Sequence, residues 1–474
     1  MRGKSMTQKS KYANLLKDTF IFALGNMGSK IIVFLLIPFY TNYLGPAEYG
    51  LADLIFTVSQ VIIPFFSLVI FDSIIRFGLF RKERSQDSLI VGGLVWLVGT
   101  VLLFFLCPVL SLYRNIAEWK WHIVVYVSLN ILVSIELNYL KVVDKNLLYS
   151  ITCIIQTASL AGLNILFVAI LHKGINGYLI AHIGSNVVVA ITAFSLGHLY
   201  KELLKAKWDK SLAKDMVCYS APLILNNLSW WVIQSSDKLM IEAMVGVAAL
   251  GIYTVASKIP SLIGVFVTIF QQAWGISSIK EMDSSNDSGF YSTVFSIYSV
   301  LAFGICIMLD LIIKPFMDVY VRSMEYGATW RFVPLLMVSA VFSAIAAYCG
   351  GMYGALKKSV NNMLSTLSAA IVNIIINYIG IIAVGLWGAI IGTLVSYMIL
   401  AYIRLIDIKR FVALDVKWRK IVFNSILVIV QAIIISFSSM QVGIIASILA
   451  VIFFVWVNRS EITRIQYIAM KKGK

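Results

Sequence analysis

The chain has 474 residues, of which 60% are hydrophobic and only 13% are charged. Its mean hydropathy of +0.88 is more than a soluble domain can hide inside one core, so the composition excludes an ordinary soluble enzyme or binding module. The formal net charge is +16, a basic balance that by itself is also compatible with nucleic-acid binding.

Apolar segments long enough to cross a bilayer recur along the whole chain. A helix needs about 20 apolar residues to span a hydrocarbon core of about 30 Å, and we count about fourteen such segments. Because lipid offers the backbone no hydrogen-bond partners, and barrel strands would be shorter and would alternate, these spans are predicted to be helices of an all-α membrane protein. The predicted spans are residues 19–42, 50–75, 88–112, 121–142, 148–171, 175–198, 217–243, 251–275, 290–313, 332–356, 362–384, 386–406, 421–439 and 441–457.

Basic residues gather on one side of this predicted topology. With the N-terminus in the cytoplasm, about 30 of the 39 lysines and arginines fall in cytoplasmic segments, about 6 fall outside and about 3 lie within spans. This asymmetry follows the positive-inside rule and predicts that both termini are cytoplasmic. The basic segments are thus explained as topology signals that contact anionic headgroups, with nucleic-acid binding a remote alternative.

A short motif occurs twice at a constant offset. LGPAEYG at residues 44–50 aligns with VGVAALG at residues 245–251, and polar residues on the spans that follow repeat at the same offset. Their spacing of i, i+4, i+7 and i+14 places them along one face of each helix. These faces either line a path or only bond neighbouring helices. The first holds Asp53, Thr57, Gln60 and Ser67, and the second holds Thr254, Lys258, Ser261 and Thr268, extended by Gln272.

The repeat predicts how the spans are grouped. Its two copies are six spans apart, so both cross the membrane in the same direction. This predicts two six-helix lobes related by an axis along the membrane normal, with a path between them. The predicted domains are an N-terminal lobe at residues 1–200, a cytoplasmic linker at 201–216, a C-terminal lobe at 217–406, and two further helices with a cytoplasmic tail at 407–474.

Charged residues within spans are the main candidates for such a path, since each costs about 2.5 to 3.5 kcal/mol at a helix centre. Lys30 is predicted near the midplane of the first span, with Asn26 one turn earlier on the same face. The seventh span combines amides, an indole and a lysine, which suits a sugar ring; the alternative is an interfacial tryptophan pair with an ion pair. Its candidates are Asn227, Trp231, Gln234, Asp237 and Lys238.

Three further charged residues lie in the cytoplasmic halves of their spans. Asp72 and Arg76 are four residues apart and are predicted to form an ion pair at the headgroups, or otherwise to belong to a cytoplasmic gate. Glu136 is predicted to pair with Lys30 or with Arg76, or to be a titrating group.

Sequence signatures of catalysis and metal binding are missing. The chain has no GxxxxGK[ST] phosphate loop, its five cysteines show no CxxC spacing, and its four histidines are scattered at span edges. We therefore expect no catalytic residues, no metal site and no bound cofactor, with coupling to H⁺ or Na⁺ left open. The absences favour a transporter over an enzyme.

Two stretches resemble a known family. KDTFIFALGNMGSKIIVFLLIPFYTNYLGPAEYGLADL at residues 17–54 and YSAPLILNNLSWWVIQSSDKLMIEAMVGVAALGIYTVASKIPSLI at residues 219–263 are similar to the start of each lobe in the polysaccharide (O-antigen type) flippases called Wzx. These belong to the multidrug/oligosaccharidyl-lipid/polysaccharide (MOP) exporter superfamily. The resemblance implies two six-helix bundles in a V around a largely cationic cavity, which Lys30, Lys238 and Lys258 would line, plus two C-terminal helices.

The same resemblance implies a function. Such proteins move a polyprenyl-diphosphate-linked oligosaccharide from the cytoplasmic to the outer leaflet of the bacterial inner membrane, by alternating access, for O-antigen, capsule or exopolysaccharide synthesis. The expected partners are this lipid-linked substrate, membrane lipid and polysaccharide assembly proteins, and the expected state is a monomer. The alternatives are a cation-coupled multidrug antiporter of the same superfamily and a membrane-embedded polysaccharide polymerase or glycosyltransferase.

Overall fold

A computed structural model describes residues 34–80, 84–268, 288–356 and 358–472, together with Ile32, Phe270, Gln271 and Trp274. The chain divides into two compact units, residues 1–235 and 236–474, whose border falls inside one long helix. The predicted assignment of two repeat-related lobes to residues 1–200 and 217–406, with a linker between, stays a prediction.

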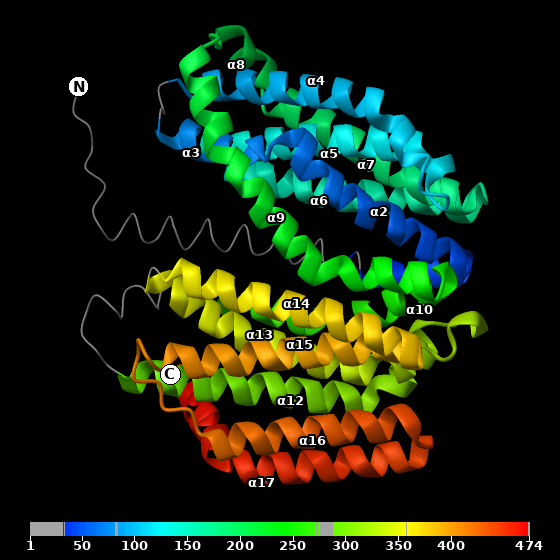
Figure 1. Ribbon diagram of the computed structural model, residues 1–474, viewed down its shortest axis with the longest axis vertical. Coiled ribbons are helices and arrows are strands. Elements are labelled where there is room, and N and C mark those ends of the chain that lie inside the picture. Colours follow the sequence, from blue (N-terminus) through cyan, green and yellow to red (C-terminus); the bar gives the residue numbers. More distant parts are fainter. Residues whose placement is uncertain are drawn as a thin grey trace. The chain divides into compact units, whose positions relative to one another are not determined.

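Every regular element in the described part of the chain is helical, which confirms the predicted all-α membrane fold (Figure 1). Eleven of these helices are long and apolar enough to cross a membrane, or twelve when one bent pair is counted as a span. The expectation of about fourteen is therefore approximate. The first predicted span begins outside the described residues, and the amides and charges in the seventh lower its mean hydropathy.

The first unit consists of helices around a central one, α5 (Lys120–Val142), which packs against α2, α3, α4 and α7. Because side chains on opposite sides of α5, such as Ile131 and Val133, are both buried, this helix forms the core of the unit. The other elements are α2 (Pro46–Ser67), α3 (Ile70–Phe80), α4 (Ser85–Leu110), η2 (Ala117–Trp119), α6 (Asn146–Asn164), the π-helix η3 (Ile165–Ile170), α7 (Gly174–Leu196), α8 (Leu199–Lys205) and most of α9 (Lys210–Met244).

The second predicted span is not one continuous helix. It breaks between α2 and α3 at Leu68 and Val69, whose φ angles of 49° and 52° lie in the left-handed region. Each such residue costs about 1 to 2 kcal/mol when it is not glycine. Pro64 has already removed one backbone donor from the last turns of α2, and the Ser67 hydroxyl accepts the Val69 N–H at 3.0 Å. The break is thus held by local hydrogen bonding that hydropathy does not reveal.

The second unit begins with the last residues of α9 and with α10 (Val247–Lys258), which meets the helix Ser261–Thr268 at an angle of 41°. Pro260 lies at this bend. In Figure 1, α16 and α17 run side by side and pack against α12. The remaining elements are α12 (Ser288–Tyr320), η4 (Met324–Tyr326), η5 (Thr329–Arg331), α13 (Val333–Ala355), α14 (Ser359–Val384), α15 (Leu386–Ile408), α16 (Trp418–Phe437) and α17 (Met440–Lys472).

Glycines bring two pairs of helices into backbone contact. A methyl group added at Gly99 of α4 would lie 2.0 Å from the Phe66 carbonyl oxygen of α2. One added at Gly388 of α15 would lie 2.1 Å from the carbonyl oxygen of Gly380 on α14. Small residues of this kind are what allows membrane helices to approach closely.

We expect Gly99→Val to destabilise the first unit, because the new side chain must push α4 away from the end of α2. Forced overpacking costs about 1 to 3 kcal/mol, which should appear as a lower unfolding temperature of the detergent-solubilised protein. Gly93→Val is the matched control, since nothing lies within 4 Å of a methyl group at that position of the same helix. Equal effects of the two substitutions would contradict the close contact.

Candidate functional site

The predicted cavity residues fall on both units, and those of each unit are described separately. Asn26, Lys30 and Gln272 lie outside the described residues, so their predicted roles are carried forward as predictions. The others lie on α2, α9, α10 and the helix Ser261–Thr268.

The polar face of α2 is buried over most of its length. Thr57 and Ser67 are buried, Asp53 is half-buried and only Gln60 is exposed. Asp53 interacts electrostatically with Tyr178 of α7. Since the Ser67 hydroxyl is used at the helix break, this residue has a structural role there.

The structure brings two of the predicted residues together, from α2 and α9. The Trp231 indole N–H donates to the Thr57 carbonyl oxygen at 3.0 Å. Asn227, one turn earlier, donates its amide to the Leu223 carbonyl of its own helix at 3.0 Å, while Gln234 is exposed. The Trp231 indole therefore ties α9 to α2 by its polar edge.

Asp72 and Arg76 are both described, and the structure does not show the ion pair predicted between them. The Arg76 guanidinium lies over the Tyr219 ring of α9, 4.4 Å from the ring centre, and such stacking suits a planar, weakly hydrated cation. Asp72 instead interacts electrostatically with Lys141, whose ammonium donates to the Asn138 side-chain oxygen at 3.1 Å. Tertiary partners thus replace the local pair.

Glu136 is buried in the middle of the first unit, with 4% of its surface exposed. One of its carboxylate oxygens has no hydrogen-bond partner among the described residues, and the predicted partner Arg76 is engaged with Tyr219. The pairing of Glu136 with Lys30 stays a prediction.

In the second unit, Asp237 is the centre of a buried polar cluster. Its carboxylate accepts the Tyr253 hydroxyl of α10 and, at 2.9 Å, the N–H of Lys238. The adjacent Ser236 hydroxyl donates to the Asn373 oxygen on α14 at 3.4 Å. The Asn377 amide donates to the same oxygen at 3.0 Å.

This cluster, formed by Ser236, Asp237, Tyr253, Asn373 and Asn377, is called the Asp237 cluster below. Asp237, Tyr253 and both asparagines are buried, and a methyl group at Gly392 of α15 would lie 2.0 Å from the Asn377 oxygen. That oxygen has no hydrogen-bond partner among the described residues. A buried carboxylate in a membrane helix, here accepting a hydroxyl and a backbone N–H, is a group that can take up a proton or a cation.

Sequence analysis identified Asp237 but missed the two asparagines on α14, one of which accepts the hydroxyl of the adjacent Ser236. Asn373 and Asn377 are four residues apart, which places both amides on one face of the mainly apolar second half of α14. That spacing is the signal that could have found them. The asparagines have no counterpart among the repeated polar positions, and so the repeat did not draw attention to them.

Two other predicted residues of this unit have hydroxyls that bond within their own helix. The Ser261 hydroxyl donates to the Lys258 carbonyl at the bend, and the Thr268 hydroxyl donates to the Gly264 carbonyl at 2.8 Å. Lys258 ends α10 and is half-buried. Hydroxyls that bond back in this way satisfy carbonyls freed near a bend.

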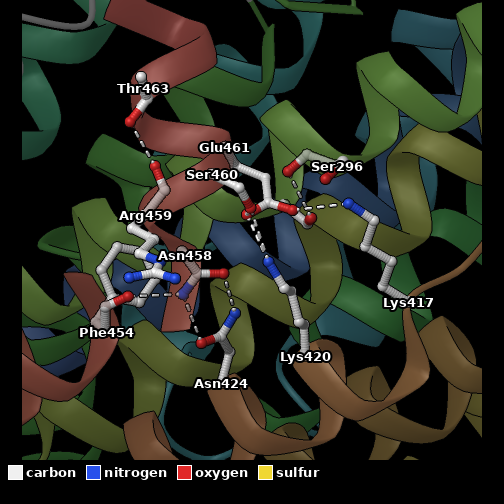
Figure 2. Close-up of polar contacts among 11 residues, drawn as sticks. Ser296, Lys417, Lys420, Asn424, Phe454, Asn458, Arg459, Ser460, Glu461 and Thr463 are labelled. Carbon is white, nitrogen blue, oxygen red and sulfur yellow. Dashed lines mark hydrogen bonds and ion pairs between the residues drawn. The ribbon is translucent and has the colours of Figure 1, made fainter. Parts of the chain in front are cut away.

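A second polar cluster, missed by sequence analysis, joins α16 and α17 (Figure 2). Glu461 accepts the ammonium groups of Lys417 at 2.9 Å and Lys420 at 2.7 Å. One helical turn away, the side-chain amides of Asn424 and Asn458 donate to each other at 3.2 and 3.0 Å. A cavity of about 410 Å³ adjoins this cluster.

Asn458 also marks a change of direction in α17, because its φ and ψ of −103° and 16° are not helical. Its amide bonds back to the Phe454 carbonyl at 2.9 Å. The paired amides therefore satisfy both buried side chains where the helix bends.

Arg404 of α15 is a third feature that sequence analysis did not single out. Its guanidinium is buried and donates to the Ala346 carbonyl at 2.8 Å, the Asn362 carbonyl at 3.2 Å, and the hydroxyls of Ser365 at 3.0 Å and Thr366 at 2.7 Å. These acceptors are all neutral. Arg404 therefore ties α15 to α13 and α14 by hydrogen bonds rather than by an ion pair.

We expect Arg404→Leu to destabilise the second unit by about 3 kcal/mol, because it removes the donors of four hydrogen bonds, two of them fully buried. Arg404→Lys keeps the charge and part of the hydrogen bonding, so its loss should be smaller. Thermal unfolding of the purified protein measures the difference. If Arg404→Leu unfolded at the wild-type temperature, the buried arginine would have no role in stability.

Two membrane proteins of other organisms are similar to this chain in sequence. An uncharacterised membrane protein of Methanocaldococcus jannaschii is 23% identical over 425 residues, covering 84% of this chain and 100% of that protein. One of Haemophilus influenzae is 21% identical over 269 residues. That match covers 55% of this chain and 64% of the Haemophilus protein.

Solved structures with the same fold are those of transporters. The lipid II flippase MurJ in an inward closed conformation superposes with a TM-score of 0.69 and 14% identity, covering 94% of this chain and 100% of that chain. An inward-facing multidrug resistance MATE transporter of the MOP superfamily gives a TM-score of 0.63 and 15% identity, covering 80% and 93%. At these identities the likeness concerns the fold.

The family is shown by the sequence itself. Residues 15–275, just over half of the chain, match the model of a family described as polysaccharide biosynthesis protein. This match, with the fold shared by MurJ and MATE transporters, confirms the resemblance drawn from residues 17–54 and 219–263. The chain belongs to the polysaccharide biosynthesis protein family and has the fold of the MOP exporter superfamily.

Proposed function

We propose that this protein is a flippase that moves a polyprenyl-diphosphate-linked oligosaccharide from the cytoplasmic to the outer leaflet, for the synthesis of a surface polysaccharide. The observation that carries the proposal is the match of residues 15–275 to a polysaccharide biosynthesis family, in a chain that folds like a lipid II flippase. The protein acts in the bacterial inner membrane as a monomer with both termini in the cytoplasm, and it catalyses no covalent reaction.

The mechanism follows from the chemistry of the substrate. A diphosphate cannot cross hydrocarbon unaided, whereas a prenyl chain stays dissolved in the bilayer while the headgroup travels through the protein. One lysine at 4 Å from a unit charge contributes about 4 kcal/mol at an effective dielectric near 20. Lys30, Lys238 and Lys258 together would therefore offset much of the hydration that the diphosphate loses.

The sugars need a different kind of contact. Amides and hydroxyls along α2 and α9 offer hydrogen bonds to sugar hydroxyls, and the Trp231 ring offers an apolar face. Alternating access is then a movement of the lobe at residues 1–200 against the lobe at 217–406. Binding in either state must stay weak enough to permit release.

We further propose that the Asp237 cluster couples transport to a cation gradient. Asp237 is a buried carboxylate in a membrane helix, and such a group is costly unless it binds a proton, a cation or strong donors. Its contacts join α9 and α10, and the adjacent Ser236 reaches α14, so a change of charge at Asp237 alters packing among three helices. The same cluster would serve a cation-coupled multidrug antiporter, which is the second candidate function.

A deletion strain tests the flippase. We expect it to lose surface polysaccharide and to regain it with the wild-type gene, but not with Lys30→Ala and Lys258→Ala together, because the diphosphate then loses two counter-charges. Lys205→Ala is the control, since this lysine is 66% exposed in a local pair with Glu202. Surface polysaccharide is measured on gels, and protein levels by immunoblot. Normal polysaccharide in a deletion strain without a paralogue would exclude the proposal, and raised sensitivity to cationic dyes would favour the antiporter.

Proteoliposomes test the coupling. We expect an imposed H⁺ or Na⁺ gradient to accelerate headgroup translocation by the wild-type protein, and Asp237→Asn to reduce the rate to its value without a gradient. Asp215→Asn, on the exposed face of the same helix, should keep the acceleration. Equal acceleration of the Asp237→Asn protein by both gradients would show that coupling lies elsewhere, whether or not the substrate is correct.

A further inference from the structure

A cavity with an apolar lining lies at the helix break of the first unit. Its volume is about 360 Å³, within the usual range of small-molecule sites. Phe65 and Leu68 line it from the end of α2, Leu94 and Val98 line it from α4, and Trp208 covers it from the segment between α8 and α9. Its lining has no charged, hydroxyl or carboxamide side chain, so it selects a hydrocarbon ligand.

The cavity is open sideways along α4. Leu94, Val98 and Leu102 line it, yet 42%, 53% and 51% of their surfaces are exposed. Only 28% of the membrane-crossing part of α4 is buried inside the protein. An exposed apolar face on a membrane helix contacts hydrocarbon. A lipid chain can therefore enter from the bilayer without passing through the interior of the unit.

Basic side chains lie beside the Trp208 end of the cavity. Lys210, Ala213 and Val217 are spaced i, i+3 and i+7 on α9, so they share the face that lines the cavity, and Lys214 follows Lys210 by one turn. Both lysines are exposed. The acidic neighbour Asp209 caps α9, because its carboxylate accepts the N–H groups of Ser211 and Leu212. The next acidic residue, Asp215, directly follows Lys214 and so lies about 100° further round the helix.

The covering segment is fixed to the unit rather than loose. The Lys207 N–H donates at 2.9 Å to the carboxylate of Asp87, a buried residue at the start of α4. Trp208 follows directly, with 55% of its surface exposed. Tryptophan at the end of a membrane helix typically lies at headgroup depth, which places the opening of the cavity beside phosphates.

We propose that this cavity binds one acyl chain of an anionic phospholipid, whose phosphate is held by Lys210 and Lys214. Charge complementarity at the Trp208 end selects an anionic headgroup, and the lateral opening on α4 selects a lipid already in the bilayer. The cavity has room for one short stretch of chain. The lipid is a resident ligand, distinct from the polyprenyl-linked substrate, and the proposal does not depend on the proposed function.

Binding at this place affects the helix break. Leu68, one of the two left-handed residues, lines the cavity, and the Ser73 hydroxyl of α3 donates to the Met216 carbonyl of α9 at 2.9 Å. A chain in the cavity therefore packs on α2, α4 and α9 at once. It stabilises the broken form of the α2–α3 connection by filling space that is otherwise empty.

Native mass spectrometry of the full chain in neutral detergent tests the proposal, with phosphatidylglycerol, phosphatidylcholine of the same acyl chains, and polyprenyl phosphate as probes. We expect phosphatidylglycerol to bind most tightly and to raise the unfolding temperature. Lys210→Gln with Lys214→Gln should weaken phosphatidylglycerol binding by at least about tenfold and leave phosphatidylcholine binding unchanged.

Filling the cavity with Val98→Trp should reduce binding of both phospholipids. Val101→Trp is the matched control, since Val101 is a valine of similar exposure, 46%, on the same helix and outside the cavity lining. Equal losses from the two tryptophans, or equal binding of phosphatidylglycerol and phosphatidylcholine, would overturn the proposal. Displacement of phosphatidylglycerol by polyprenyl phosphate at lower concentration would assign the cavity to the substrate chain and overturn it as well.

Discussion

The structure depends on one constraint: polar groups in hydrocarbon must find their hydrogen-bond partners within the protein. The constraint makes every described regular element a helix, and it decides how each irregularity is handled. At the break between α2 and α3 the Ser67 hydroxyl accepts a backbone N–H. At the bend after α10 the Ser261 hydroxyl donates to the backbone carbonyl of Lys258. Where a whole cation is buried, at Arg404, four neutral acceptors surround it. Among the described residues, one oxygen each of Glu136 and Asn377 is buried without a protein hydrogen-bond partner.

The helices themselves could be predicted from the sequence, and most of the polar contacts could not. Apolar length placed the span at 88–112 where α4 runs from Ser85 to Leu110, because hydropathy is a property of each segment alone. Contacts between helices depend on how segments far apart in the chain meet. Arg76 has an acid four residues away but stacks on Tyr219, and nothing in the spacing of α3 could reveal that ring. The left-handed pair at Leu68 and Val69 is equally hidden, since both residues are ordinary in a membrane helix.

Among the candidate site residues, one chosen because a charge within the membrane is energetically costly has contacts to other helices, whereas two chosen by their spacing bond to their own helix. Asp237 drew attention because a charge in a membrane helix is expensive, and it lies in a buried cluster with Tyr253. Ser261 and Thr268 drew attention by periodicity, and their hydroxyls bond to their own helix. Periodicity marks a face without saying what the face does, whereas a buried charge must be compensated by something.

The contact between Gly380 and Gly388 has a mechanical consequence for the second unit. With main chain against main chain, there is no side chain whose rotamer could change to let α14 and α15 slide, so the two helices form a single plate. The edges of this pair are where it meets the other helices of the unit. One of those edges carries the hydrogen bond from Ser236 to Asn373, next to the carboxylate of Asp237. If Asp237 changes charge as proposed above, this edge is where its altered contacts would act on the pair of helices.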